Sequence, residues 1–190
     1  MYMYRRNHLR FLFSFGLAFL LLIVALIFIL LHGNSTSSEK LIAGYAKNPS
    51  AYAAMLIDGP VNAPSQHNQV LVVVSNSVTK VEVFSGYNDN ILRSATYPMD
   101  ESAFHVFLRS LEYAGYTEGS NNPDLRQASG YCPTGDRYIF SFGVNGKQIL
   151  RYWTTDCGGT HTYDGNLQLT LTLFQAQVPQ YSQLTTNLNI

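Results

Sequence analysis

Few cysteines, few charged side chains and no basic run beyond the first ten residues characterise this sequence of 190 residues. Two cysteines and the neighbouring His161 are too few ligands for a structural zinc site. Without clustered lysines and arginines to neutralise phosphates, the sequence argues against a nucleic-acid partner. No glycine-rich phosphate loop follows a predicted strand, and we therefore expect no cofactor. Abundant tyrosine, phenylalanine and β-branched residues argue against a disordered chain.

The longest hydrophobic run, residues 11–31, is interrupted only by Ser14 and Gly16. As a helix it would span about 31 Å, which matches a hydrocarbon core of about 30 Å. A cleavable signal peptide is the alternative, but its apolar region would be about 7–15 residues long and would end in small residues. The run is longer and ends in Leu30-Leu31-His32. We therefore predict an uncleaved transmembrane helix whose partner is the lipid bilayer.

Charge is distributed unevenly about this run. Arg5, Arg6 and Arg10 precede it, whereas all 12 acidic residues follow it. Because basic flanks stay on the cytoplasmic side, we predict a single-pass protein with its N-terminus inside and its larger part outside. The predicted organisation is a cytoplasmic basic tail (1–10), the transmembrane helix (11–31), a tether (32–50), an extracytoplasmic domain (51–181) and a polar tail (182–190).

Four segments rich in β-favouring residues follow the tether, at 53–57, 69–75, 80–83 and 91–97. The unbroken hydrophobic run 70–74 predicts a central strand that is covered on both faces. Because the connections between these segments are short, we expect an antiparallel meander.

The next segment predicts an amphipathic helix. Asp100 is a suitable N-cap, and Gly115 suits the position just past the C-terminus. His105 lies off the hydrophobic stripe and is expected to be solvated rather than to bind a metal. Residues spaced as on one helical face form the stripe: Phe104, Phe107, Leu108 and Leu111.

Asn145-Gly146 is the preferred two-residue turn of a β-hairpin. An uninterrupted hairpin around it pairs Val144 with Lys147 and places six larger side chains on one face. In this register Arg151 covers the ring of Phe140. The predicted pairs on this face are Tyr138 with Trp153, Phe140 with Arg151, and Phe142 with Ile149.

Cys132 and Cys157 lie where this hairpin opens. Because the predicted compartment is oxidising, we expect a disulfide between them rather than two independent buried thiols. In the chain-entropy model, closing a loop of this length contributes about 3–4 kcal/mol.

The polar loop that follows Cys157 is the best-placed candidate binding loop, and its candidate residues are Thr160, His161, Tyr163 and Asp164. His161 and Asp164, with Asp156, also suggest a base with an orienting acid for a hydrolase. Side chains of these types are more often simple turn formers that bond the local backbone. We therefore assign no catalytic residue.

Residues 167–178 fit both a strand and a helix, because their leucines alternate while Leu171, Phe174 and Val178 follow a helical stripe. Twelve residues are long for a strand, and Pro179 would end a helix, so we predict a helix. The expected fold is therefore α+β: about six antiparallel strands, built as a four-strand meander, a helix, a disulfide-closed hairpin and a second helix.

Several short motifs stand out: Ile57-Asp58-Gly59-Pro60-Val61, Gly86-Tyr87, Ala114-Gly115-Tyr116-Thr117, Cys132-Pro133-Thr134-Gly135 with Tyr138, Trp153 with Cys157, and Leu173-Phe174-Gln175-Ala176-Gln177-Val178-Pro179. In this order and spacing they resemble uncharacterised single-pass membrane-anchored proteins of candidate-phylum bacteria of the Saccharibacteria type. The resemblance covers about residues 50–181. It implies a location at the bacterial cytoplasmic membrane and brings no activity with it.

The outer part is rich in tyrosine, amides and hydroxyls, which suits a binding surface for a protein or a glycan. We therefore expect a surface binding or cell-envelope interaction module. The alternatives are a structural envelope component without a specific ligand, and a hydrolase that uses the loop around His161.

Overall fold

The computed structural model describes residues 42–190. The predicted basic tail, the transmembrane helix and most of the tether lie outside these residues. Among the helices of residues 42–190, none combines the length and the apolar character that a membrane span requires.

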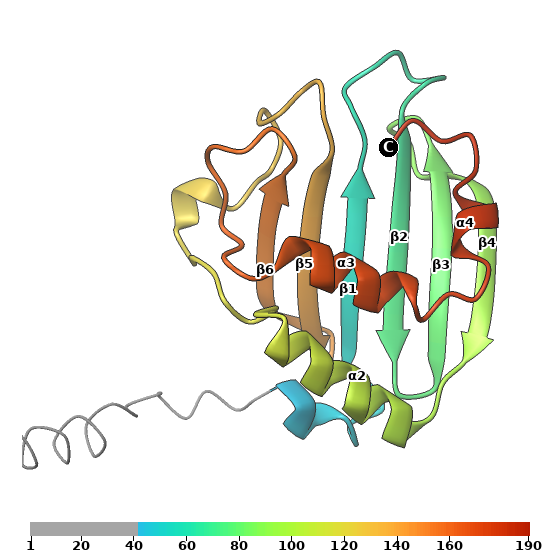
Figure 1. Cartoon of the computed structure of the whole chain (residues 1–190), viewed down its shortest axis with the longest axis vertical. Helices are drawn as coiled ribbons and strands as arrows, with labels where there is room; N and C mark the ends of the chain where they lie inside the picture. The colour runs from blue at the N-terminus through green and yellow to red at the C-terminus, as the bar shows by residue number, and fades with distance from the viewer. Residues whose placement is uncertain (1–41) are drawn as a thin grey trace, which may run out of the picture. The chain divides into compact units, whose positions relative to one another are not determined.

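Six strands form one antiparallel sheet, in the order β4-β3-β2-β1-β5-β6 (Figure 1). The first four are the predicted meander and the last two are the predicted hairpin, so the expected six-strand antiparallel sheet is confirmed. The strands are β1 (Tyr52–Asp58), β2 (Asn68–Ser75), β3 (Val78–Ser85), β4 (Asn90–Pro98), β5 (Arg137–Val144) and β6 (Lys147–Thr155).

Helices α2 and α3 lie over one face of the sheet (Figure 1), which confirms the α+β class. The helix expected within 167–178 is confirmed as α3, which ends at Gln175 before Pro179. The helical elements are η1 (Ile42–Tyr45), α2 (Glu101–Tyr113), η2 (Pro123–Leu125), α3 (Leu167–Gln175) and α4 (Tyr181–Leu184).

The caps of α2 are those expected from the sequence. Asp100 accepts a hydrogen bond from the backbone N–H of Ala103 (2.8 Å), and Gly115 has a φ of 76° just past the helix end. A glycine is favoured there because a side chain at positive φ is strained. The four residues of the predicted stripe are all buried.

The main core lies between the helices and the sheet. Phe107 of α2 and Phe174 of α3 meet edge to face with ring centroids 5.2 Å apart. Tyr116, which is fully buried, donates its hydroxyl to the carbonyl oxygens of Ala54 (3.1 Å) and Ser141 (2.7 Å). The segment after α2 is thereby fixed to β1 and β5.

The prediction that β2 is covered on both faces is wrong. Val70, Val72 and Val74 are fully buried under the helices, but Leu71 and Val73, on the opposite face, are only partly buried. The reason is that α2 and α3 cover one face of the sheet alone. A hydrophobic run in a strand does not reveal how many faces are covered.

The hairpin turn is as predicted, but the register is not. Asn145 and Gly146 have φ values of 53° and 73°, and Val144 pairs with Lys147. The register then shifts between Phe142 and Gly143, which leaves Ile149 as the extra residue of a β-bulge. The observed pairs are Phe142 with Leu150, Phe140 with Tyr152, and Tyr138 with Thr154.

A one-residue shift moves every later side chain of the strand to the other face. Arg151 and Trp153 therefore lie on the face away from the helices, and the predicted contact of Arg151 with Phe140 is wrong. Trp153 instead forms a small second core with Ala128 and Ile139.

The predicted polar tail (182–190) packs against the domain. Leu184, Leu188 and Ile190 contact the main core, and the backbone N–H of Asn189 donates to Asn68 (3.1 Å). The polar composition of the tail gave no indication that these three apolar side chains contact the core.

Candidate functional site

The four residues of the predicted binding loop differ in their exposure to solvent. Thr160, His161 and Asp164 are exposed, whereas Tyr163 is buried. The hydroxyl of Tyr163 lies 2.6 Å from that of Thr170. Tyr163 therefore anchors the loop to the core and does not face solvent.

The same loop does not assemble the acid–base arrangement of a hydrolase. Nε2 of His161 lies 3.5 Å from Oδ1 of Asp164, and both side chains are about half exposed. Oδ1 of Asp156 contacts the sulfur of Cys132 (3.2 Å) rather than His161. None of the three cavities described below is lined by His161 or Asp164.

The predicted disulfide between Cys132 and Cys157 is present, with the two Cα atoms 5.7 Å apart. The sulfurs and a carboxylate oxygen of Asp156 lie within 4.8 Å of one another, as the donor atoms of a metal site would. Because the metal ligand is a free thiolate and both sulfurs are bonded to each other, this group does not suit a metal ion.

An acidic cluster adjoins the disulfide. Burial and the nearby carboxylate of Asp156 raise the pKa of Asp136 above its ordinary value. Burial, reinforced by the charge of Asp136, raises the pKa of Tyr138 to about 12. The charged form of Asp136 is thus disfavoured in the folded protein.

Asp136→Asn is therefore expected to stabilise the protein at neutral pH. The substitution removes the repulsion from Asp156 and the cost of a partly buried charge, and solvent screening limits the gain to about 1 kcal/mol or less. Because the pKa of Asp136 is raised in the folded protein, the gain should shrink as the pH falls through that raised pKa and should vanish below the ordinary pKa of aspartate. Urea unfolding at neutral and acidic pH measures this gain in the free energy of unfolding. The exposed Asp124→Asn is the control, and an equal gain for both variants would contradict the explanation.

A polar cleft of about 510 Å³ is lined by residues of β6 and of the loop that carries η2. Figure 1 shows the backbone of these two segments side by side. Its lining combines amides, hydroxyls and two arginines and contains no acidic residue. The lining residues are Ser120, Asn121, Asn122, Leu125, Arg126, Gln127, Gln148, Ile149, Leu150, Arg151 and Thr162.

Two hydrogen bonds fix the loop wall of the cleft to β6. Nη1 of Arg151 donates to the carbonyl oxygen of Arg126 (2.6 Å), and Nε1 of Trp153 donates to that of Leu125 (2.6 Å). Trp153 is fully buried, and the ring of Tyr131 packs on it with centroids 4.8 Å apart. The small second core thus positions the loop.

The second wall is held by a connection across the edge of β6. The backbone N–H of Thr162 donates to the carbonyl oxygen of Trp153 (2.9 Å), and the N–H of Trp153 donates to Oγ1 of Thr162 (2.9 Å). Ser120 in turn donates its N–H to the carbonyl oxygen of Thr162 (2.8 Å). Both walls are therefore held in place by hydrogen bonds before any ligand binds. Partial burial lowers the pKa of the Arg151 guanidinium.

Sequence reasoning missed the two cleft arginines. No role was assigned to Arg126, and the uninterrupted hairpin placed Arg151 on the same face as Phe140. The bulge at Ile149, which nothing in the local sequence indicated, reverses that placement.

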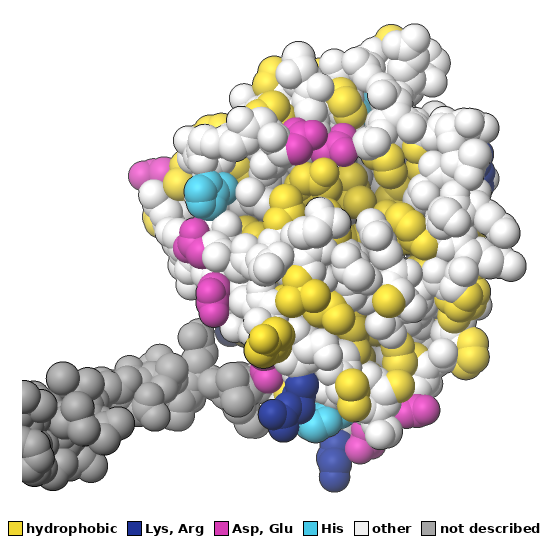
Figure 2. All heavy atoms as spheres, viewed as in Figure 1, with side chains coloured by type: hydrophobic (Ala, Val, Ile, Leu, Met, Phe, Trp, Pro, Cys, Tyr) yellow, Lys and Arg dark blue, Asp and Glu magenta, His cyan; other side chains and the backbone are white. Residues whose placement is uncertain are grey.

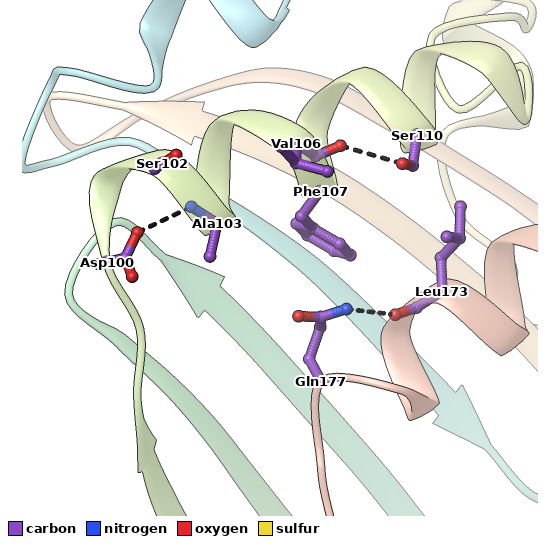
Figure 3. Close-up of a pocket in the computed structure, with 8 residues that line it drawn as sticks. All are labelled: Asp100, Ser102, Ala103, Val106, Phe107, Ser110, Leu173 and Gln177. Carbon is purple, nitrogen blue, oxygen red and sulfur yellow. Dashed lines mark hydrogen bonds between the residues drawn. The ribbon is translucent and has the colours of Figure 1, made fainter.

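A groove of about 480 Å³ between α2 and α3 is less suited to recognition (Figure 3). Figure 3 shows that most of its polar side chains are already bonded locally: Asp100 to Ala103, Ser110 to Val106, and Gln177 to Leu173. A third cavity of about 430 Å³, next to Tyr113, is largely apolar. On this face charged side chains are sparse and hydrophobic ones are scattered (Figure 2).

Asp58, His67 and Arg137 form a polar cluster that sequence reasoning also missed. Oδ2 of Asp58 accepts from Nε of Arg137 (2.8 Å), and Oδ1 accepts from Gln69 (2.8 Å). Nε2 of His67 lies 3.1 Å from Oδ1, and the ring of His67 stacks on Tyr87. His67 is fully buried and Arg137 is 3% exposed, so the cluster is structural rather than a ligand site.

No protein-family model matches the chain, and no curated protein matches it. The geometry of the polar cleft therefore carries the functional argument.

Proposed function

We propose that this protein is a membrane-anchored, extracytoplasmic binding module that holds a protein or glycan of the cell envelope in the polar cleft beside β6. The observation that carries the proposal is the cleft itself, with about 510 Å³ of space, side chains that offer hydrogen bonds, and two cationic groups. Binding sites combine such a preformed hollow with a few well-placed polar groups.

The proposed location has three supports. The hydrophobic run 11–31 is long enough to span a bilayer, and the arginines that precede it favour a cytoplasmic N-terminus. The Cys132–Cys157 disulfide suits an oxidising, extracytoplasmic compartment. The resemblance to single-pass proteins of Saccharibacteria-type bacteria favours the bacterial cytoplasmic membrane. The proposal does not include catalysis, because His161 and Asp164 are both about half exposed and line none of the three cavities.

Photo-crosslinking on intact cells tests this function. A photoreactive amino acid replaces Gln148, which lines the cleft, in the full chain expressed in its bacterial host. We expect a light-dependent adduct with an envelope protein or glycan. The matched control places the same group at the exposed Gln168 of α3. A structural component without a ligand would give no adduct at position 148, or equal adducts at both positions.

A further inference from the structure

Strand β6 is the last strand of the sheet, and part of its outer edge opens into the cleft. The backbone of Trp153 points outward, because its carbonyl oxygen accepts from Thr162 (2.9 Å) and from Tyr163 (3.0 Å). Backbone groups of an antiparallel strand alternate between its two sides. Arg151, two residues earlier, therefore directs its N–H and C=O toward the same outer side.

No segment pairs with that edge at Arg151. The connection through Thr162 and Tyr163 meets β6 at Trp153, and within residues 42–190 no backbone hydrogen bond from another segment reaches Arg151. A free edge is a template onto which an extended chain can add as a further strand. The part of β6 that lines the cleft, 148–151, is short, so only a short segment fits.

The charge of the cleft is uncompensated. Within the described part of the chain, neither Arg126 nor Arg151 forms an ion pair, and no acidic side chain lines the cleft. Arg151 donates one hydrogen bond to the carbonyl oxygen of Arg126, and its guanidinium retains several N–H groups that can donate to a ligand. Arginine binds a carboxylate through paired, charge-assisted hydrogen bonds, and such a ligand would complete the site.

The opposite edge strand, β4, lacks this combination. Its Arg93 donates to the carbonyl oxygens of Leu184 (2.7 Å) and Thr186 (3.0 Å), so its charge holds the C-terminal segment. None of the three cavities is lined by residues of β4. The free edge and the unpaired cations coincide only at β6 among the edges of the described sheet.

We infer, on the basis of the proposed function, that the ligand of the cleft is a short extended peptide segment bearing a carboxylate. Its backbone pairs with the edge of β6 at Arg151, and its carboxylate lies between Arg151 and Arg126. The carboxylate belongs to an acidic side chain or to a free C-terminus, since either presents the same group. A glycan offers no backbone repeat that matches the strand edge, so the peptide is favoured.

Selection from a random hexapeptide pool on the purified full-length chain in detergent tests the inference. One half of the pool has free C-termini and the other half has amidated C-termini. We expect the protein to enrich peptides with Asp or Glu, or with a free terminus. Arg126→Gln should weaken their binding about tenfold, because one charge-assisted contact is lost. Arg126 is exposed and its guanidinium forms no ion pair within residues 42–190, so folding should be unaffected. Arg109→Gln on α2 is the matched control.

N-methylation of the selected peptide tests the backbone pairing. Methylating the one amide that donates to Arg151 should abolish binding, whereas methylating its neighbour should not. Equal effects at both positions would overturn the strand-pairing inference. If no peptide binds but a neutral or acidic oligosaccharide does, the inference of a peptide ligand is overturned, whereas the proposed function stands. Failure of peptides and oligosaccharides alike, together with no adduct at position 148, would overturn both.

Discussion

Trp153→Ala is expected to lower the free energy of unfolding by about 3–5 kcal/mol, the range for large buried aromatic side chains. Trp153 is fully buried and joins the sheet to the loop wall of the cleft through Ala128, Tyr131 and the carbonyl oxygen of Leu125. The sheet face away from the helices has no other described core cluster that could compensate. Urea unfolding followed by circular dichroism measures the loss.

Trp153→Phe separates packing from hydrogen bonding. It keeps an aromatic ring but removes the donor to Leu125, and we expect a loss of about 1–2 kcal/mol. Ligand binding should weaken in both variants, because the loop that carries Arg126 loses its anchor. A loss below about 1 kcal/mol for Trp153→Ala would show that the loop does not depend on this core.

Asp58→Asn is expected to cost a similar amount, about 3–5 kcal/mol, because it leaves a buried cation without its partner. The carboxylate accepts from Arg137 and Gln69 and faces His67. Arg137 also donates to the carbonyl oxygen of Gly59 (2.7 Å), and it is almost fully buried. An amide is nearly the same shape but carries no charge and turns one acceptor into a donor.

The pair Lys80–Glu82 provides the matched control, because its cation is solvated whereas Arg137 is 3% exposed, although Glu82 itself is only 13% exposed. Lys80 is about half exposed and lies 2.7 Å from Glu82, so Glu82→Gln should cost less than about 1 kcal/mol. Equal losses for Asp58→Asn and Glu82→Gln would show that burial does not amplify the Asp58–Arg137 pair.

Short-range sequence signals correctly predicted those elements of the fold that depend on a few neighbouring residues. The Asn145-Gly146 turn, the Asp100 cap and the Gly115 end all appear where their backbone preferences place them. The disulfide followed from the position of Cys132 and Cys157 at the open end of one hairpin. The helix over 167–175 followed from its hydrophobic stripe and the proline beyond it.

The candidate site depends on features that are not local. The bulge at Ile149 inserts one residue into β6, and that residue decides whether Arg151 faces the helices or the loop. Asp58 and Arg137 are 79 residues apart and meet only because β1 and β5 are neighbours in the sheet. No local sequence pattern indicates the bulge or the strand order, and Arg151 in the cleft and the Asp58–Arg137 pair were therefore not predicted.

Hydrogen–deuterium exchange on the full-length chain tests most directly whether the cleft is the binding site. Exchange is measured with and without the peptide that the pool enriches most. We expect slower exchange of the backbone amides in 148–151 and in the facing loop 120–127, with no change in α2. Slowed exchange confined to α2 and α3, or no change in 148–151 at saturating peptide, would contradict it.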